Sequence, residues 1–372
     1  MEPVTLNAGD VILRIHSPGD IDGIVDQCTD PETARWTTVP QPYERSDGES
    51  FVQSHVPIGW RDDTAYEFAI ADAKTDEFLG SVGLRPDGPG GAELGFGLRR
   101  AARGRGVTLT AAEALLDWGF APDGLGLEVV HWRAHIGNWA SRRVAWRLGF
   151  RMEGAVRGLL VSRGKRYDGW VGTLRSTDRR APLRAWYDVP VLTGERCVLR
   201  PFAETDVAAV VEGCTDPQTR HWLSALPDPY TPEDALGYIQ SRAEEHASGR
   251  GIYWAAADPE TGQCLGSFGL MAMDELGGGA EVGYWMHPSA RGRGVATDAV
   301  RLLVRHATID LEDGGLGLRR LTLRTASGNA ASQRVAAKAG FERTGVERAA
   351  EKLGDGTFDD LVGWDQLLDP GA

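Results

Sequence analysis

The sequence predicts a mixed α/β fold in which two copies of one domain follow each other along the chain. Two observations carry this prediction: short segments recur in the same order in both halves, and in each half strand-like alternation changes to helical periodicity after a glycine-rich turn. The repeat distance is about half of the 372 residues, which is too long for a solenoid unit and typical of a globular domain. We therefore expect domains 1–182 and 183–372, with the boundary near Leu183.

The internal repeat is clearest near the start of each half. Cys28–Trp36 recurs as Cys214–Trp222 at an offset of 186 residues, and Leu79–Leu84 recurs as Leu265–Leu270 at the same offset. Later segments keep their order while the offset grows to 191 residues. Each half is therefore expected to fold as a complete globular domain.

The first elements of each half are expected in the same order. A strand opens each half, and a helix follows for which Asp20 or Asp206 is the expected N-cap. A loop rich in Trp, Pro and Tyr then leads to a second helix, and two strands precede the glycine-rich turn. The expected ranges are Val11–Ile15, Asp47–His55, Glu67–Ala71 and Leu79–Leu84 in the first half, and Cys197–Arg200, Pro232–Ala247, Tyr253–Ala257 and Leu265–Leu270 in the second.

Beyond the glycine-rich turn, the spacing of apolar residues becomes helical. The helix expected here is followed by a strand and by another helix, which opens at Asn138 or Asn329 and ends at Gly149 or Gly340. The positions expected to face inward are Ala112, Leu115, Leu116, Gly119, Val130, Trp132, Ala134, Ser141, Val144, Ala145 and Leu148, and in the second half Ala299, Leu302, Leu303, Ala307, Leu321, Leu323, Thr325, Ser332, Val335, Ala336 and Ala339.

Composition excludes several classes of function. Hydrophobic residues at 42% and charged residues at 25% describe an ordinary globular protein. A net charge of −13 argues against a general nucleic-acid binder or a protein that docks on anionic membranes, because both need broad basic surfaces. The four cysteines lack metal-ligand spacing, so we expect no metal site. Together with the absence of a long apolar run or a signal peptide pattern, they favour the cytoplasm.

The sequence Arg-Gly-Arg-Gly-Val occurs twice, at 103–107 and 291–295, each time between a strand-like and a helix-like segment. Glycines let backbone N–H groups approach an anion closely, and the following helix directs its unpaired amides to the same place. The flanking arginines add positive charge. The alternative is a solvated surface loop. Two copies in matched positions favour a phosphate site in each domain.

The order of these motifs resembles the GNAT superfamily of acyl-CoA-dependent N-acyltransferases. The residues that carry the resemblance are a Glu-x-Gly strand, an Arg-Gly-x-Gly-x-Ala turn that opens a helix, and a Gly-Asn-x-x-Ser helix closed by Gly-Phe. The branch that it is most similar to is that of the RimJ/RimL-type ribosomal-protein N-terminal acetyltransferases. The resemblance implies two tandem GNAT domains arranged as a pseudo-dimer, and a monomer would satisfy it.

The resemblance also implies that acetyl-CoA is the acyl donor and that its pyrophosphate binds at the glycine-rich turns. The first half departs from the family pattern at Thr108, where Gly or Ala is usual, and this β-branched side chain could crowd the phosphate or donate a hydroxyl to it. The residues expected to bind acetyl-CoA are Leu98, Arg103, Gly104, Arg105, Gly106, Val107, Thr108 and Asn138, and in the second half Met286, Arg291, Gly292, Arg293, Gly294, Val295, Ala296 and Asn329.

Acyl transfer to an amine requires a base, because primary amines are mostly protonated at neutral pH. Glu93 and Glu281 are the candidates, and the alternative is a carboxylate that only makes a salt bridge. A leaving thiolate needs a nearby hydroxyl, for which Ser141 and Ser332 are the candidates. No tyrosine lies in either Asn-x-x-Ser helix, so this role falls to serine or to ordered water. The alternative for each serine is a bond to the backbone of its own helix.

The resemblance further implies that backbone amides around 96–98 and 284–286 hold the developing oxyanion. The acceptor is expected to be a small-molecule amine or a protein N-terminal amine, attacking directly in a ternary complex. The residues expected to contact it are Trp36, Tyr43, Trp222 and Tyr230, although aromatic residues in such loops are more often partly core.

Two other interpretations of function are kept open, and both leave some part of the chain without catalysis. In the first interpretation, the site at Thr108 has lost cofactor binding, and the first domain serves as a scaffold or substrate platform that replaces the partner of a homodimer. The whole chain could also be an acyl-CoA sensor without turnover. Because Gly97 is replaced by Trp285 in the second half, we expect the two sites to accept different amines, or one of them to accept a bulkier acyl group.

Overall fold

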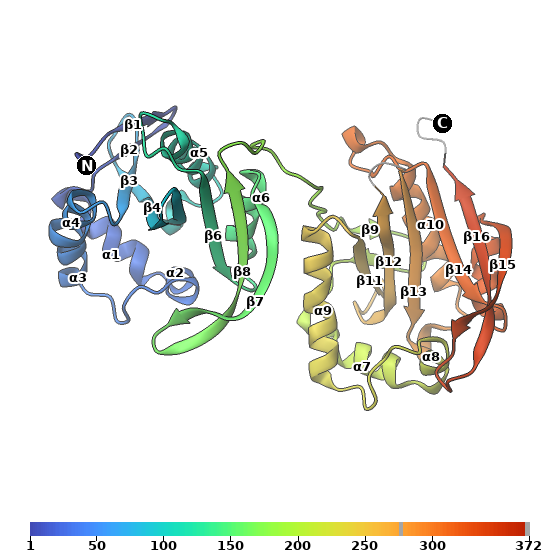
Figure 1. The fold of residues 1–372 in the computed structure, drawn as a ribbon. Coiled ribbons are helices and arrows are strands. Elements are labelled where there is room, and N and C mark those ends of the chain that lie inside the picture. The colour runs from blue at the N-terminus through green and yellow to red at the C-terminus, as the bar shows by residue number, and fades with distance from the viewer. Residues whose placement is uncertain (275–277, 369–372) are drawn as a thin grey trace. The chain divides into compact units, whose positions relative to one another are not determined.

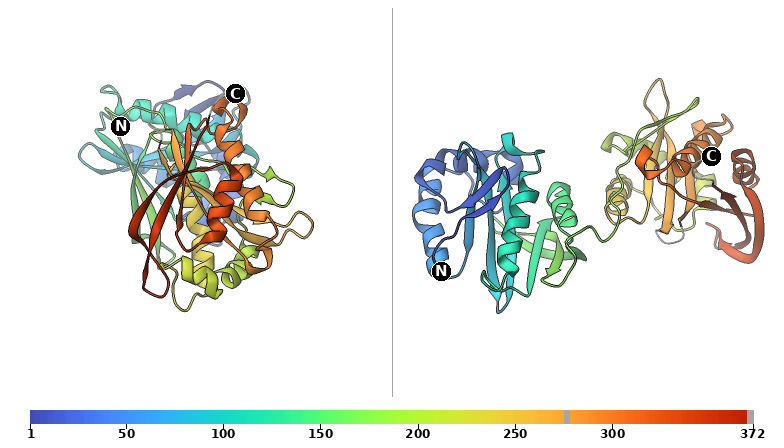
Figure 2. Two further views of the ribbon diagram at one scale, coloured as in Figure 1. Left: turned by 90° about the vertical axis from the view of Figure 1, so that its right-hand side faces the viewer. Right: turned by 90° about the horizontal axis from the view of Figure 1, so that it is seen from above.

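The computed structural model describes residues 1–274 and 278–368 (Figure 1). Contacts divide the chain into two compact units, Met1–Leu183 and the remainder from Arg184 onward. Each unit contains one eight-stranded sheet with helices packed on both of its faces (Figure 2). The mixed α/β architecture that the sequence predicted is confirmed in both halves.

The first unit follows the predicted order of elements and adds some at its ends. Its strands are β1 (Leu6–Ala8), β2 (Val11–Arg14), β3 (Tyr66–Asp72), β4 (Phe78–Gly88), β5 (Gly91–Leu98), β6 (Val129–His135), β7 (Arg151–Ser162) and β8 (Lys165–Arg175). Its helices are α1 (Ile21–Thr29), α2 (Pro31–Trp36), α3 (Arg45–Ser50), α4 (Val56–Arg61), α5 (Val107–Phe120) and α6 (Trp139–Arg147), with short 3₁₀ turns η1 (Pro18–Asp20) and η3 (Arg100–Ala102) and a π turn η2 (Phe51–His55).

The second unit repeats this order with small differences. Its strands are β9 (Leu192–Thr193), β10 (Val198–Arg200), β11 (Ile252–Ala257), β12 (Cys264–Asp274), β13 (Gly279–Met286), β14 (Arg320–Ala326), β15 (Glu342–Lys352) and β16 (Phe358–Leu367). Its helices are α7 (Val207–Thr215), α8 (Pro217–Trp222), α9 (Pro232–Ala247), α10 (Val295–Thr308) and α11 (Ala330–Ala339), with 3₁₀ turns η4 (Glu204–Asp206), η5 (Pro288–Ala290) and η6 (Leu311–Asp313).

The two sheets have the same strand order, β1-β2-β3-β4-β5-β6-β8-β7 and β9-β10-β11-β12-β13-β14-β16-β15. The pairs β5/β6 and β13/β14 run parallel, and the other described neighbours run antiparallel. Each parallel pair stops early: β5 leaves β6 after the Leu94–Trp132 pair, and β13 leaves β14 after Val282–Leu323. Since β5 and β13 each continue for four more residues, an opening forms between the two central strands.

Separate apolar clusters lie on the two faces of each sheet. In the first unit, α5 and α6 pack with Phe68, Leu84 and Leu94, whereas α1 packs with Ala69 and Phe78. The second unit repeats this division, with α10 and α11 in one cluster and α7 and α9 in the other. Most of the positions predicted to face inward are buried, while Ser141, Val144, Ser332 and Val335 are half-buried.

Two local predictions about helices need correction in detail. Asp20 and Asp206 occupy the predicted N-cap positions of α1 and α7, but their carboxylates make no capping hydrogen bond to those helices. Each instead accepts from the amide three residues earlier and pairs with an arginine of the opening strand. The helix predicted to end at His55 continues through a π turn into α4, because that turn shifts the hydrogen bonding and places Pro57 near a helix start, where its missing N–H is tolerated.

Candidate active sites in the two splayed sheets

Both glycine-rich turns adopt the conformation that an anion cradle needs. Gly104 and Gly106 have φ of +75° and +79°, and Gly292 and Gly294 have +73° and +80°. Helices α5 and α10 begin directly after these turns. A Cβ added at Gly104, Gly106 or Gly292 would meet nothing within 4 Å. Successive N–H groups and a helix N-terminus therefore face open space, which fits a diphosphate.

The first arginine of each turn is directed away from this space. The Nη2 atom of Arg103 donates to the Asp30 carboxylate at 2.6 Å, to the Thr33 hydroxyl at 3.1 Å and to the Leu98 carbonyl oxygen at 3.2 Å. Arg291 repeats these contacts with the equivalent residues of the second unit. Both side chains link the end of a central strand to a neighbouring helix. Within an anion site, these two arginines would therefore contribute their backbone N–H groups and not their guanidinium groups. Arg105 and Arg293, by contrast, are exposed.

One basic side chain beside the second turn has no equivalent in the first. Arg196 lies 3.2 Å from the position of a Cβ on Gly294, and its Nη1 donates to the Arg293 carbonyl at 3.2 Å. Its backbone amide donates to Asp298 in the first turn of α10. The repeat places Asp10 at the corresponding position of the first unit. The second turn is therefore the more positive of the two.

Backbone amides line the opening between the central strands. The amide of Arg99 donates to Leu79 of β4, and that of His287 donates to Leu265 of β12. Successive amides of a strand point in opposite directions, so the amides one and three residues before Arg99 and His287 face the opening and not β4 or β12. These are the amides of Leu98 and Phe96 in the first domain, and of Met286 and Tyr284 in the second. The positions expected to hold an oxyanion thus have amides free of the antiparallel ladder.

The Asn-x-x-Ser segments lie in the first turns of α6 and α11. Asn138 and Asn329 are N-caps, and their side-chain oxygens accept from the amides of Ser141 and Ser332 at 3.2 and 3.1 Å. Each serine hydroxyl is bonded to a side chain from a strand: Ser141 to Trp132 Nε1 at 3.0 Å, and Ser332 to the Tyr284 hydroxyl at 2.8 Å. Each serine therefore has a side-chain partner beside the opening.

The two candidate bases are both engaged in ion pairs. Glu93 lies 3.1 Å from Arg133, and Glu281 lies 3.1 Å from Arg324, each pair joining the two parallel strands. The glutamates are partly exposed. The pairing with Glu281 raises the pKa of Arg324. An ion-paired carboxylate is less available to take up a proton, which limits how strong a base either site can supply.

The four aromatic candidates divide into two groups. Trp36 lies beside His135 and within 3.5 Å of a Cβ position on Gly137, and Trp222 lies 3.4 Å from that on Gly328. Both indoles therefore lie next to the residue that precedes Asn138 or Asn329. Their half-buried positions are compatible with a substrate contact.

Tyr43 and Tyr230 lie in the helical layers instead. Each packs in an apolar cluster and pairs with a buried thiol, Cys28 or Cys214, and burial raises the pKa of both phenols. Tyr230 is only 7% exposed. This packing favours the core interpretation for the two tyrosines over a substrate contact.

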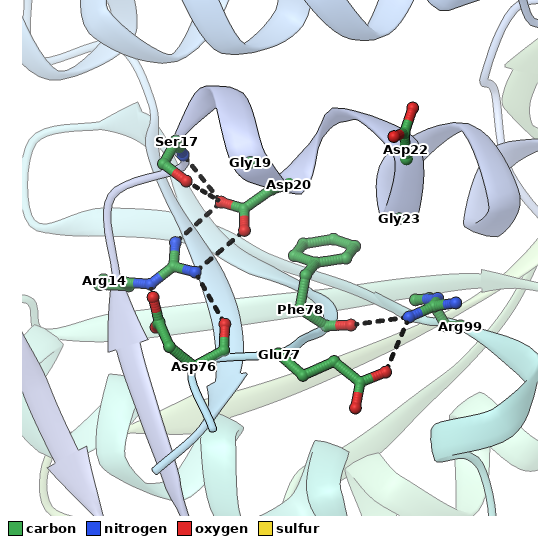
Figure 3. A pocket seen from close by; sticks show the side chains of 10 residues that line it. All are labelled: Arg14, Ser17, Gly19, Asp20, Asp22, Gly23, Asp76, Glu77, Phe78 and Arg99. Atoms are coloured by element: carbon green, nitrogen blue, oxygen red, sulfur yellow. Dashed lines mark hydrogen bonds and ion pairs between the residues drawn. The ribbon is translucent and has the colours of Figure 1, made fainter. Parts of the chain in front are cut away.

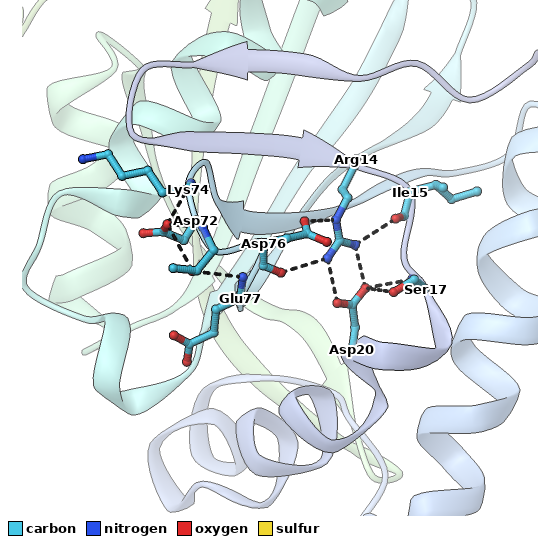
Figure 4. A network of polar contacts seen from close by, with 9 residues as sticks. Arg14, Ile15, Ser17, Asp20, Asp72, Lys74, Asp76 and Glu77 are labelled. Carbon is cyan, nitrogen blue, oxygen red and sulfur yellow. Dashed lines mark hydrogen bonds and ion pairs between the residues drawn. The ribbon is translucent and has the colours of Figure 1, made fainter.

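A shallow pocket of about 360 Å³ in the first unit has a structural role (Figure 3). Its charged groups are paired with one another: Arg14 bonds Asp20 and Asp76, and Arg99 bonds Glu77 at 3.1 Å. Figure 4 shows this network joining β2, η1 and the turn between β3 and β4. The same arginine–aspartate pair recurs as Arg200 and Asp206 in the second unit. The network therefore stabilises both domains and does not belong to the glycine-rich turn.

Sequence reasoning missed three side chains at these sites. No role was predicted for the side chain of Tyr284 or of Arg196, and Trp132 was predicted only to face inward from its strand. The repeat itself held a signal for two of them, since Tyr284 replaces Phe96 and Arg196 replaces Asp10. Such a change of polarity at one repeat position could have marked both as site residues.

Metal-binding clusters and membrane-spanning helices are both absent from the described residues. Residues 1–274 and 278–368 contain no group of three or more His, Cys, Asp or Glu side chains placed to hold a metal ion. In the same part of the chain, no helix is both long enough and apolar enough to cross a membrane.

Comparison with known proteins agrees with this geometry. The family described as an acetyltransferase (GNAT) domain matches residues 10–151 and again residues 196–342. The chain is similar to the uncharacterized N-acetyltransferase YoaA of Bacillus subtilis (strain 168), with 29% identity over 161 residues, or 43% of this chain and 86% of the relative. It is similar to the ribosomal-protein-serine acetyltransferase of Escherichia coli (strain K12), with 29% identity over 107 residues, or 29% of this chain and 56% of the relative.

Among solved structures, the chain is similar to Mycobacterium smegmatis RimJ in complex with CoA-disulfide. The two share 19% identity over 48% of this chain and 87% of the other, with a TM-score of 0.43.

Proposed function

Because this chain belongs to the acetyltransferase (GNAT) family in each of its two halves, we propose that it carries two acetyl-CoA-dependent N-acetyltransferase sites, one in each domain. The transfer would proceed by direct attack of a primary amine on the acyl group while both substrates are bound. The observation that carries this proposal is the pairing, in each domain, of an open glycine cradle with an opening between the central strands.

Each domain offers the same set of groups to the donor. Acetyl-CoA supplies an activated acetyl thioester when it is bound. The amides of the turn and the start of α5 or α10 would hold its diphosphate. The amides of Phe96 and Leu98, or of Tyr284 and Met286, would stabilise negative charge on the carbonyl oxygen. Asn138 or Asn329 would contact the pantetheine arm while capping its helix.

The ion pairs at the candidate bases favour an acceptor that is already partly neutral. An α-amino group has an ordinary pKa of about 7.7 to 8.0 and a lysine side chain about 10.4, so near pH 7.4 roughly a quarter of the former and about a thousandth of the latter is neutral. Glu93 and Glu281 would then orient the amine and take up its proton late. We propose the α-amine of a peptide or protein as the acceptor, with Trp36 and Trp222 beside it.

A weaker first site is the second candidate, and two observations favour it. Thr108 stands where the second domain has Ala296, and Asp10 stands where the second domain has Arg196. The acidic side chain and the bulkier turn residue would both weaken binding of a diphosphate. In this form the second domain catalyses and the first serves as a scaffold.

Calorimetric titration of the full chain with CoA tests the proposal. We expect wild type to bind two equivalents, and Gly106→Glu and Gly294→Glu to bind one each, because an added Cβ and carboxylate would occupy the cradle. Gly126→Glu and Gly314→Glu are matched controls, since these exposed glycines also have positive φ and open space at the Cβ position. One equivalent in wild type, lost only in Gly294→Glu, would favour the scaffold form. No binding by wild type would refute both.

A further inference from the structure

The hydroxyl groups of Ser141 and Ser332 are held by donors that come from different strands. Trp132 is the last residue of β6 that pairs with β5, and its Nε1 lies 3.0 Å from Ser141 Oγ. Tyr284 lies on β13, two residues beyond the last pair with β14, and its hydroxyl lies 2.8 Å from Ser332 Oγ. Both donors thus lie where the central strands separate.

The repeat shows that these donors are exchanged between the domains. Leu323 occupies in the second domain the position that Trp132 occupies in the first, and Phe96 occupies in the first domain the position of Tyr284. Each domain therefore has one donor to its serine and one apolar residue at the other position. The bond is kept although the residue that makes it has moved from one strand to the other.

In both domains this bond leaves the hydroxyl proton of the serine available to another acceptor. An indole N–H can only donate, so Ser141 Oγ must accept, and its single proton is left for another partner. Phenol is the more acidic partner in the Tyr284–Ser332 pair, so it donates in preference to the aliphatic hydroxyl. Tyr284 also packs face to face on Phe268, with ring centroids 5.2 Å apart, which fixes the direction of its hydroxyl. Ser332 is then left with its own proton free as well.

We propose that Trp132 and Tyr284 are equivalent positioning residues, each of which transfers no proton itself but turns the O–H of its serine toward the sulfur of CoA bound in the opening. This inference rests on the proposed function. It implies that both domains are equipped to stabilise the leaving thiolate, including the first domain with its less favourable turn.

During the reaction, the serine O–H would donate a hydrogen bond to the leaving thiolate. As the C–N bond forms and the C–S bond breaks, the electron pair of the C–S bond stays on sulfur, and the proton of the amine passes to Glu93 or Glu281 and from there to solvent. Burial raises the pKa of Tyr284 to about 12, whereas a thiol has an ordinary value of about 8.5. Transfer of the phenolic proton to the thiolate is therefore unfavourable, and Tyr284 acts by orienting Ser332.

The pKa of the thiol of bound CoA tests the positioning role without an amine acceptor. This pKa is measured from the ultraviolet absorbance of the thiolate as pH is varied, with CoA bound to full chains in which only one site remains. Gly106→Glu leaves the site of the second domain, and Gly294→Glu leaves that of the first. A hydroxyl that donates to the thiolate should lower the pKa of bound CoA by about one unit relative to free CoA. The protein's own thiols should remain protonated at the pH values where the CoA thiol ionises. Burial raises the pKa of Cys28, Cys214 and Cys264 to about 11 and that of Cys197 to about 12.

In these chains Tyr284→Phe and Trp132→Phe should return the pKa of bound CoA to that of free CoA. Ser332→Ala and Ser141→Ala should do the same, and each pair of changes should not be additive. With acetyl-CoA and a peptide that has a free N-terminal serine, kcat should fall about three- to tenfold while KM for acetyl-CoA is unchanged.

Tyr238→Phe is the matched control in the second domain. The Tyr238 hydroxyl makes an equally short bond, 2.8 Å, to Ser267, but on the face of the sheet opposite to Tyr284. It should leave the pKa of bound CoA unchanged. In the first domain, Phe96→Tyr should restore the lowered pKa to the Trp132→Phe chain, because it supplies the donor from the strand that the second domain uses.

The outcomes separate this inference from the proposed function. If wild type does not bind CoA, the proposed function fails. If CoA binds, and the serine variants raise its pKa while Tyr284→Phe and Trp132→Phe do not, the positioning role is refuted and the proposed function stands. An effect of Tyr284→Phe that equals that of Tyr238→Phe would also refute it.

Discussion

Single buried side chains distinguish the two domains even where the backbone is the same. His16 is 5% exposed, its Nε2 lies 3.0 Å from Ser81 Oγ, and its ring packs on Phe51. Burial lowers the pKa of His16 to about 4, against smaller opposing effects of Glu67 and Asp20. The second domain has Phe202 at this position. A neutral imidazole in one domain thus replaces a phenyl ring in the other.

This histidine makes the stability of the first domain depend on pH. His16 takes up a proton near pH 6.5 in the unfolded chain but only near pH 4 in the folded domain. The free energy of unfolding therefore falls as pH drops below 6.5. Between pH 7 and pH 5 we expect a loss of about 2 kcal/mol from His16. His16→Phe should remove this share of the loss in urea unfolding. An unchanged pH dependence would show that His16 is protonated in the folded domain.

At the scale of elements, the sequence predicted those parts that depend on local periodicity. Helix α9 has the predicted bounds, and α6 and α11 begin after the expected asparagines, because capping and apolar spacing are properties of neighbouring residues. The closing strands β7 and β8 were not predicted. They form a hairpin with each other, and β7 is exposed along most of its length, so its apolar and polar residues show no clear alternation.

The sites show the same division between local and distant effects. The glycine cradle and the N-caps could be predicted, because each lies within a few residues of sequence. The Tyr284–Ser332 bond joins residues 48 positions apart, and the direction of Arg291 depends on α8, which precedes it by more than 60 residues. Only the fold brings such groups together.

The contacts of Arg291 predict an effect on stability larger than that of its neighbour Arg293. Arg291 donates to Asp216, Thr219 and Met286, whereas Arg293 is 56% exposed and lies 3.8 Å from Asp258. Arg291→Gln should lower the free energy of unfolding of the second domain by about 1 to 3 kcal/mol, and Arg293→Gln by less than about 0.5 kcal/mol.

Binding of CoA should separate the same two variants in another way. Arg293→Gln should reduce the salt dependence of CoA affinity, because it removes an exposed charge beside the cradle. Arg291→Gln should weaken CoA binding with the salt dependence retained. A lost salt dependence and an unchanged stability in Arg291→Gln would mean that its side chain turns to the phosphate.

At the scale of the molecule, the same fold holds two different residue pairs, each with one buried side chain, in its two domains. On the sheet face that α1 and α7 cover, the first domain has Gln27 over Gly97, and the second has Trp285 over Gly213. The second pair is both larger and less polar than the first. We therefore expect both sites to acetylate peptide α-amines, with the first site preferring a polar neighbouring side chain and the second an apolar one.

This preference can be measured on full chains that keep one site, Gly294→Glu or Gly106→Glu. Both should favour peptides with a free α-amine over an Nα-blocked lysine by at least about tenfold, because of the neutral fraction of each amine. Adding Gln27→Gly with Gly97→Trp to the first-site chain should move its peptide profile toward that of the second. Identical profiles of the two sites from the start would count against the assignment.

The reciprocal pair Gln27/Gly97 and Gly213/Trp285 also limits the routes by which the halves could have diverged from one ancestor. A Cβ on Gly97 would lie 2.9 Å from the side-chain amide nitrogen at the flexible end of Gln27, whereas a Cβ on Gly213 would overlap the rigid Trp285 ring. A route in which the helix residue becomes small before the strand residue becomes large avoids both clashes. Such a route passes through a sequence with glycine at both positions, and the void in that intermediate would cost about 1 to 3 kcal/mol that the rest of the domain had to tolerate.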